Sequence, residues 1–279
     1  MTGQGAQQSH STRRPKYGQH FLVNQSLCRK IVDLAQLTPS DRVVEIGPGR
    51  GALTSLLLER AGDVWAIEVD PALAAHLRDR FGHRPRFHLI EQDALRVEFE
   101  ELPAPYTVVA NLPYAVASPL LIRLLEARRS IPLMVLMFQR EVAERLVAEP
   151  GGREYGLLTI IARLYADVRL AVKVSPGSFR PPPKVESAVV TVTPRPKPAV
   201  PIEDEAAFLR LIRVGFAHRR KTMRNNLCHA HLTAARCDAL LRKAGIDPAR
   251  RPETLGLEEW GRVYECCRTL GIQIGDWVK

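Results

Sequence analysis

Apolar residues in this chain follow two patterns that alternate along the sequence: short continuous runs, and residues spaced three or four positions apart. Continuous runs typical of buried strands lie at residues 42–46, 64–69, 86–90, 106–110 and 133–138. Between these runs, apolar residues recur every three or four positions, which predicts helices. The predicted helices span 52–60, 71 to about 80, a segment beginning at Ser118-Pro119, and about 140–148. Strands that alternate with helices predict an α/β fold with a mostly parallel sheet covered on both faces.

Further elements are predicted on either side of this alternating region. Asn24 is a suitable N-cap for a helix whose apolar face includes Leu27, Ile31 and Leu34. Residues 168–174 and 187–193 are strand-like, and we expect them to complete the sheet as a late antiparallel pair.

The pattern changes at a proline-rich segment, residues 193–201, which is typical of a stiff linker. Beyond it, helical spacing occurs at 206–217, 234–244 and 257–270. We therefore expect a disordered basic tail at 1–16, an α/β domain at 17–200, and a small all-helical domain at 201–279.

Composition narrows the class of protein. The 279 residues are 46% hydrophobic and 25% charged, as in soluble globular proteins. The formal net charge of +10 favours a polyanionic partner such as a nucleic acid. A run of about 18 apolar residues, long enough to cross a membrane, does not occur. The polar N-terminus lacks a secretory signal, so we expect a cytoplasmic protein without a membrane partner.

The five cysteines predict neither a disulfide framework nor a metal site. Their number is odd and two are adjacent, so we expect reduced thiols. Cys228, His229, His231 and Cys237 could be interpreted as zinc ligands, but their spacing matches no common zinc pattern.

Three polar or glycine-rich features follow three successive predicted strands. Gly47-Pro-Gly-Arg-Gly51 lies where glycine would let the backbone turn and approach a ligand. Glu68 could accept both hydroxyls of a ribose, and Asp93 could accept a hydrogen bond from an exocyclic amine such as that of adenine. Taken singly, each has a plainer interpretation, as a tight turn, a solvated acid or a helix cap. Together they would meet at the carboxyl edge of the sheet, where α/β proteins bind ligands.

The ligand predicted by these features is a nucleoside without phosphates. The chain contains no G-x-x-x-x-G-K-[ST] loop, which disfavours nucleotide hydrolysis. S-adenosylmethionine (SAM) is such a nucleoside, and we take it as the predicted cofactor.

The segment Asn111-Leu-Pro-Tyr114 follows the fourth strand and suits chemistry at an adenine N6 amine. That amine is a weak nucleophile because its lone pair is delocalised into the ring. The Asn111 side chain and the Leu112 carbonyl could accept its two N–H groups, with Pro113 fixing the backbone. Tyr114 could stack on an extruded base. The plainer interpretation is a turn with a buried tyrosine. The chain lacks the Pro-Cys dipeptide typical of methylation at a pyrimidine carbon.

A second aromatic precedes a run of three prolines in Ser178-Phe-Arg-Pro-Pro-Pro-Lys-Val185. Phe179 could hold the base opposite Tyr114, with Arg180 and Lys184 on phosphates. A proline-rich ligand of an SH3-type domain is the alternative, which the strand-like flanks disfavour.

These motifs, with Tyr17-Gly-Gln-His-Phe-Leu22, closely resemble the bacterial small-subunit ribosomal RNA adenine dimethyltransferase A family, over residues 14–270 or so. The resemblance implies a Rossmann-like SAM-dependent methyltransferase domain. The implied activity is dimethylation of N6 on two adjacent adenines near the 3′ end of 16S rRNA. The cofactor contacts implied by the family are His20, Leu22, Gly47, Glu68, Asp93 and Asn111. His20 stands where the family usually has Asn.

The resemblance also implies that the helical domain contacts rRNA. Residues 218–226 contain Arg219, Arg220, Lys221 and Arg224 and no acid, although a solvated helix face is the plainer interpretation. We expect a monomer that acts on the small ribosomal subunit or its precursor. Two related functions are the alternatives: a 23S rRNA adenine methyltransferase of the macrolide-resistance type, and a non-catalytic nucleic-acid-binding member of the superfamily.

Overall fold

A computed structural model describes residues 20–218, 220–230, 232–274 and 277 of the chain. The strands are β1 Phe21–Leu22, β2 Arg42–Ile46, β3 Asp63–Ile67, β4 Phe87–Ile90, β5 Thr107–Asn111, β6 Met134–Gln139, β7 Ala166–Val174, β8 Phe179–Arg180 and β9 Ser187–Pro194. The α-helices are α1 Gln25–Leu34, α2 Ala52–Arg60, α3 Pro71–Phe81, α4 Ala117–Glu126, α5 Arg140–Leu146, α6 Leu157–Tyr165, α7 Glu205–Gly215, α8 Met223–His229, α9 Ala234–Lys243 and α10 Leu257–Thr269.

Seven strands form one sheet in the order β4-β3-β2-β5-β6-β9-β7. The first five are parallel, and β9 pairs antiparallel with both β6 and β7, as the sequence predicts for the late strands. The chain runs outward from β2 to β4 and then returns to β5 on the other side. Strands β2 and β5 therefore flank the point where the strand order reverses, which is the usual ligand site of such sheets.

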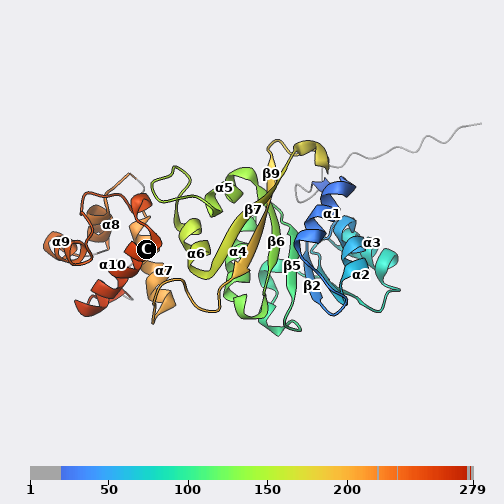
Figure 1. Cartoon of the computed structure of the whole chain (residues 1–279), viewed down its shortest axis with the longest axis horizontal. Coiled ribbons are helices and arrows are strands. Elements are labelled where there is room, and N and C mark those ends of the chain that lie inside the picture. Colours follow the sequence, from blue (N-terminus) through green and yellow to red (C-terminus); the bar gives the residue numbers. More distant parts are fainter. Residues whose placement is uncertain (1–19, 219, 231, 275–276, 278–279) are drawn as a thin grey trace, which may run out of the picture.

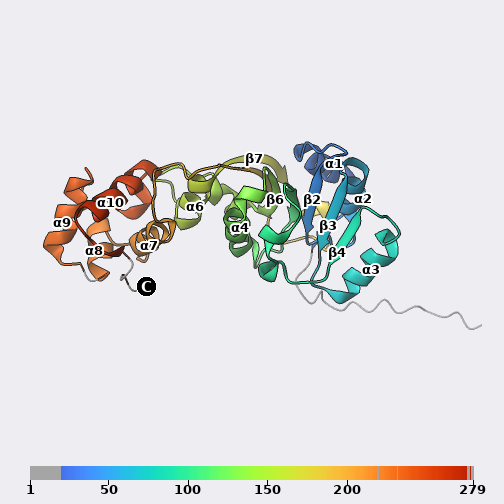
Figure 2. The ribbon, with the colours of Figure 1, turned by 90° about the horizontal axis from the view of Figure 1, so that it is seen from below.

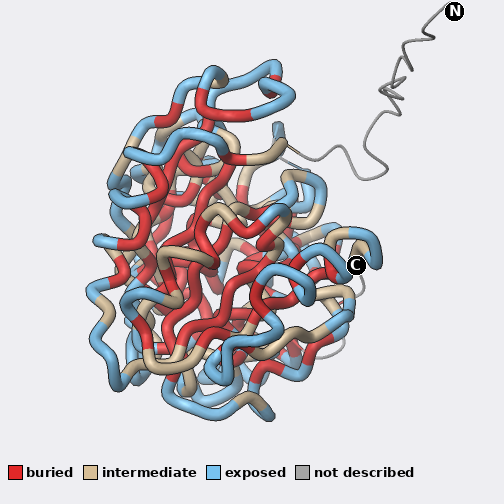
Figure 3. The backbone as a smooth tube through the Cα atoms, turned by 90° about the vertical axis from the view of Figure 1, so that its right-hand side faces the viewer, coloured by how far each residue is buried: buried red, intermediate tan, exposed pale blue. Residues whose placement is uncertain are grey.

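The molecule is elongated, with α1–α3 at one end and α7–α10 at the other, and α4–α6 lie between them (Figures 1 and 2). Helices cover both faces of the sheet. One face packs against α1, α2 and α3, and the other packs against α4 and α6. Buried residues fill the interior of the molecule (Figure 3), and the central strands β2, β5, β6 and β9 supply many of them. This arrangement confirms the predicted α/β fold with a mostly parallel sheet.

Side-chain hydrogen bonds confirm two predicted helix N-caps. The Asn24 side chain accepts the Leu27 amide at 3.1 Å and caps α1. Asp70 accepts the Ala72 amide at 2.9 Å and caps α3, with Pro71 at the first helical position. Helices α6 and α8, and the short pair β1 and β8, are elements that the sequence pattern does not predict.

The proline-rich segment, residues 193–201, packs against the rest of the fold and is not a free linker. Strand β9 extends to Pro194, and the Arg195 and Ala199 amides donate to carbonyls at the end of α6, at 2.7 and 2.8 Å. Val200 is buried against the position of Gly261 in α10. One cluster of buried apolar residues runs from the sheet through α6 into α7–α10. The helical part therefore shares a core with the sheet across the expected boundary at 200/201.

The described residues include no helix long and apolar enough to cross a membrane. All five cysteines are free thiols, and the Sγ atoms of Cys228 and Cys237 are 3.1 Å apart. No group of three or more metal-binding side chains gathers within the described ranges. The tail at 1–16 and His231 lie outside these ranges.

Candidate active site

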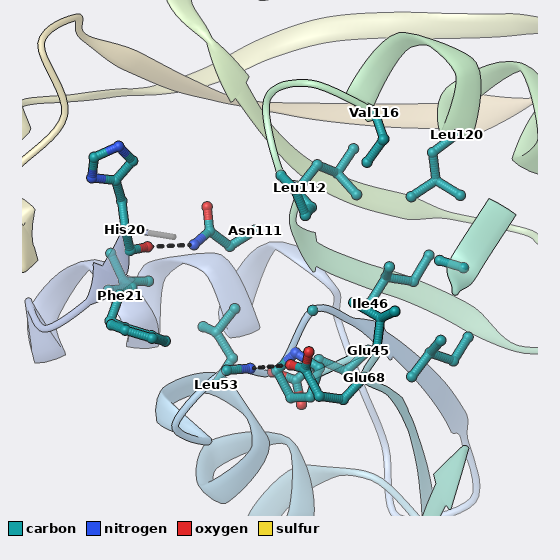
Figure 4. Close-up of a pocket in the computed structure, with 18 of the residues that line it drawn as sticks. His20, Phe21, Glu45, Ile46, Leu53, Glu68, Asn111, Leu112, Val116 and Leu120 are labelled. Atoms are coloured by element: carbon teal, nitrogen blue, oxygen red, sulfur yellow. Dashed lines mark hydrogen bonds between the residues drawn. The ribbon is translucent and has the colours of Figure 1, made fainter. Parts of the chain in front are cut away.

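A cavity of about 350 Å³ opens at the carboxyl ends of β2, β3, β4 and β5. The sequence-predicted residues that line it are His20, Leu22, Gly47, Glu68, Asp93, Asn111, Leu112, Pro113 and Tyr114. Segments nearly a hundred residues apart in the chain thus meet around one space, and its volume suits a small-molecule ligand. Figure 4 shows several of these side chains around it.

The glycine-rich loop forms one wall and needs its glycines. Gly47, Gly49 and Gly51 have φ angles of 68°, 57° and 80°, a region that other residues rarely adopt. A Cβ on Gly51 would lie 2.5 Å from the ring of Phe81. A Cβ on Gly49 would lie 3.1 Å from the ring of Phe21, so the loop and that ring pack closely.

Glu68 is 4% exposed, and its two carboxylate oxygens accept different backbone amides. Gly49 donates at 3.2 Å and Asp70 at 3.0 Å, which ties the glycine loop to the end of β3. Burial raises the pKa of Glu68, while these two hydrogen bonds oppose the rise. Glu68 therefore shapes the loop as well as facing the cavity.

Asp93 lies across the cavity at the end of β4. One of its carboxylate oxygens accepts the Leu95 amide at 3.0 Å and caps a short 3₁₀ turn, Ala94–Arg96. The plainer interpretation as a helix cap is thus correct in part. Asp93 also lines the cavity, and its other carboxylate oxygen, Oδ2, accepts no hydrogen bond from the described residues.

Glu45 is a cavity-lining acid that the sequence motifs do not single out. It is 1% exposed and accepts a 2.6 Å hydrogen bond from the Thr54 hydroxyl in α2. Burial raises the pKa of Glu45 to about 8, and the nearby charge of Glu68 adds to the rise. An acid next to the Gly47 loop that stays largely protonated at neutral pH leaves Glu68 as the main negative charge of this wall.

A strap formed by residues 20–22 lies over the cavity and is held at several points. Strand β1 pairs antiparallel with β8, and the Asn111 amide nitrogen donates to the His20 carbonyl at 3.3 Å (Figure 4). The His20 ring nitrogen Nδ1 lies 2.8 Å from the Pro181 carbonyl. On the other side, the Arg50 guanidinium carbon sits 4.7 Å from the centre of the Phe21 ring. These contacts connect the glycine loop with the 111–114 loop.

All four residues of the 111–114 loop line the cavity. Because the Asn111 amide nitrogen is used by His20, its Oδ1 remains an acceptor. Leu112 is buried at 1% exposure. The Tyr114 hydroxyl lies 2.7 Å from Ser187 Oγ, which fixes a half-buried ring at the cavity wall. Burial raises the pKa of Tyr114, opposed by that hydrogen bond.

Phe179 does not face the cavity, so the structure corrects its predicted position opposite Tyr114. Its side chain is fully buried with Leu22, Val174 and Val189. The cause is the pairing of β8 with β1, which places Phe179 opposite Leu22. Arg180 and Lys184 beyond it are exposed, and Arg180 donates to the Phe179 carbonyl at 3.0 Å.

The predicted basic cluster is only partly available to a polyanion. Arg220 and Lys221 are exposed, whereas Arg219 lies outside the described residues. Arg224 forms a 2.7 Å ion pair with Asp238, so its charge is already compensated. Sequence reasoning missed three exposed cations of α9 that form no ion pair within the described part of the chain: Arg236, Arg242 and Lys243.

Comparison with known proteins identifies the family. The family model described as ribosomal RNA adenine dimethylase matches residues 10–268. The chain belongs to this family. A ribosomal RNA small subunit methyltransferase A from Syntrophotalea carbinolica is 43% identical over 256 residues, covering 90% of this chain and 96% of that protein. As a dimethylase-family member, the chain is a SAM-dependent transferase with ribosomal RNA as its substrate.

Two solved structures of related enzymes superimpose on most of the chain. A dimethyladenosine transferase from Plasmodium falciparum aligns with a TM-score of 0.77 and 28% identity, covering 91% of this chain and 99% of that one. The 23S rRNA methyltransferase ErmE aligns with a TM-score of 0.69 and 28% identity, covering 88% and 98%. The sheet with its helical extension is thus shared with both of these solved structures.

Proposed function

We propose that this dimethylase transfers methyl groups from SAM to N6 of two adjacent adenines near the 3′ end of 16S rRNA, within the small subunit or its precursor. The observation that carries the proposal is the meeting of Glu68, Asp93 and the 111–114 loop around one cavity. The small-subunit methyltransferase relative at 43% identity supports this choice of RNA.

The cavity offers complementary groups to each part of SAM. We infer that Glu68 accepts the ribose hydroxyls, that Asp93 accepts the adenine amine, and that the glycine loop and residues 20–22 enclose the rest. When bound, SAM supplies a methyl group on a sulfonium, which needs alignment with the nucleophile more than acid–base help.

The protein's part in the transfer is to hold and activate the target amine. Asn111 Oδ1 and the Leu112 carbonyl would accept the two N6 hydrogens, which would favour a pyramidal nitrogen with an available lone pair. Pro113 restricts the Leu112 backbone, and the Tyr114 ring stacks on the base. Phe179 takes no part in this scheme, because its ring lies in the core.

On the RNA side, we propose that Arg220 and Lys221, together with Arg219, bind phosphates, and that Arg180 and Lys184 do so near the cavity. Arg224 contributes less because Asp238 already pairs with it. We infer a monomer acting in the cytoplasm, where ribosomal subunits are assembled. The 23S alternative has weaker support, since ErmE is 28% identical. The intact 111–114 loop argues against a purely binding role.

The test uses isolated ribosomal subunits that lack the modification, incubated with the protein and SAM carrying a labelled methyl group. We expect label in small subunits and not in large subunits. Asn111→Ala, which removes the side-chain acceptor, should lower the rate at least about a hundredfold. Label in large subunits alone would favour the 23S activity. Binding of small subunits without any transfer would favour the non-catalytic role.

A further inference from the structure

Three side chains from three helical elements meet where the sheet domain joins the helical domain. Arg128, just after α4, donates to both carboxylate oxygens of Glu205 at 2.8 and 3.1 Å. The Tyr165 hydroxyl, at the end of α6, donates to the same carboxylate at 2.8 Å. The Arg128 guanidinium carbon also lies 4.3 Å from the centre of the Tyr165 ring. We call Arg128, Tyr165 and Glu205 the junction triad.

The triad is better placed for strength than the chain's exposed ion pairs. The Arg128 side chain is 12% exposed, and a single guanidinium nitrogen, Nη2, donates to both carboxylate oxygens of Glu205. Hydrogen bonds between two charged groups are stronger than bonds between neutral groups. Glu205 occupies the first turn of α7, where the helix dipole stabilises a carboxylate. Burial and the bond to Glu205 both raise the pKa of Tyr165, so it remains a donor.

Helix α4 connects the triad to the 111–114 loop. Helix α4 begins at Ala117, shortly after residues 111–114, and both Val116 just before it and Leu120 in its first turn line the cavity. It ends at Glu126, two residues before Arg128. Ten helical residues span about 15 Å, so α4 is a short rigid rod between the cavity and the triad.

In the other direction, α7 leads to the basic cluster. Helix α7 begins at Glu205 and ends at Gly215, shortly before Arg220 and Lys221. Its start is also tied to α10, because the Asp204 amide donates to the Tyr264 hydroxyl at 3.0 Å. Both views of the ribbon place α7 within the helical domain, beyond α6 as seen from the sheet (Figures 1 and 2).

We propose that Arg128, Tyr165 and Glu205 are positioning residues that set the direction of the helical domain relative to the 111–114 loop. The proposal rests on the proposed function. The triad joins α4, which begins beside the 111–114 loop, to α7, which ends near Arg220 and Lys221. It thereby determines which adenine reaches the cavity when the helical domain is bound to rRNA.

Other contacts keep the domains attached when the triad is broken. Gly151 donates its amide to the Glu253 carbonyl at 2.7 Å, and the buried Tyr155 hydroxyl donates to the Leu255 carbonyl at 2.9 Å. The shared apolar core also continues through α6. Loss of the triad should therefore alter alignment without releasing the helical domain, which separates positioning from simple attachment.

The variants for the test are Arg128→Met and Glu205→Gln. The first removes the charge and keeps most of the volume. The second keeps the size and an acceptor for Tyr165, so it carries the test if Arg128→Met does not fold. The matched control is Arg163→Met, which breaks a 2.6 Å ion pair with Glu149 elsewhere on α6 without touching α7. For each protein we measure kcat with saturating small subunits, affinities for small subunits and S-adenosylhomocysteine, and the positions of the methylated adenines.

We expect kcat of Arg128→Met to fall about ten- to a hundredfold, because a misplacement of about 1 Å can have an effect of that size. Glu205→Gln should lower kcat less, by about three- to tenfold. Both affinities should stay within about twofold, and some label should move to other adenines. The control should match the wild type.

Either of two results would overturn the positioning role alone: variants with the control's kcat and methylation sites, or a loss of subunit affinity at unchanged kcat. A wild-type protein that methylates no adenine in small subunits would remove the proposed function, and the positioning role with it.

Discussion

Glu68→Gln is the sharpest single perturbation of the cofactor site, because it changes chemistry with almost no change in volume. The carboxylate accepts the Gly49 and Asp70 amides with separate oxygens. Whichever way a glutamine amide turns, its NH₂ faces one of these donors, so one bond is lost. The remaining bonds, including those proposed to the ribose, lose their charge. Hydrogen bonds to charged groups contribute about 1.5–3 kcal/mol, so SAM affinity should fall about 10- to 100-fold.

The assay is calorimetric titration with S-adenosylhomocysteine, which binds without reacting. Glu59→Gln is the control, since Glu59 lies exposed near the end of α2 and does not line the cavity. A thermal unfolding curve for each variant confirms that the folded protein is being titrated. If Glu68→Gln binds as tightly as Glu59→Gln, the carboxylate neither shapes the loop nor contacts the ribose, and the site assignment is wrong.

Two further predictions concern the buried acid and the basic cluster. The pKa of Glu45 is about 8 in the folded protein, against an ordinary value of 4.5. Between these pH values the unfolded chain has released the proton, whereas the folded chain still holds it. The free energy of unfolding therefore falls as the pH rises from 4.5 to 8. Glu45→Gln should remove this slope and add up to about 3 kcal/mol to the free energy of unfolding at pH 7.5, measured by urea titration; an unchanged slope would contradict the assignment. Reversing Arg220 and Lys221 to Glu should weaken small-subunit binding and make its salt dependence shallower, while SAM affinity stays intact. The same reversal at the exposed pair Arg29 and Lys30 should leave both the binding and its salt dependence unchanged. Equal effects of the two reversals would count against a role of Arg220 and Lys221 in RNA binding.

The parallel sheet and its ligand edge were predictable because the central strands β2, β5 and β6 are buried on both faces. Such strands are short continuous apolar runs, and caps such as Asp70-Pro71 mark the helices between them. Helix α6 escaped prediction because it is short and mostly apolar, and periodicity alone does not distinguish such a run from a buried strand. It packs between α4 and the helical domain. Strand β1 has two residues, too few to show any period.

Within the site, the sequence predicts which residues line the cavity better than it predicts their partners. Asn111 and Glu68 lie at strand ends, so their place follows from the topology. The direction of Phe179 depends on pairing with a strand more than 150 residues away, which no local pattern records. The pairing of Arg224 with Asp238 likewise depends on how α8 packs on α9. Charge runs in a sequence therefore overstate the charge available for binding.

We propose that this dimethylase converts two adjacent adenines near the 3′ end of 16S rRNA to N6,N6-dimethyladenine. The most direct test is mass spectrometry of the 3′ fragment of 16S rRNA after incubation of unmodified small subunits with the protein and isotope-labelled SAM. We expect labelled dimethyladenosine at both positions, and none with Asn111→Ala. A 3′ fragment that stays unlabelled while the protein binds SAM and small subunits would contradict the proposal.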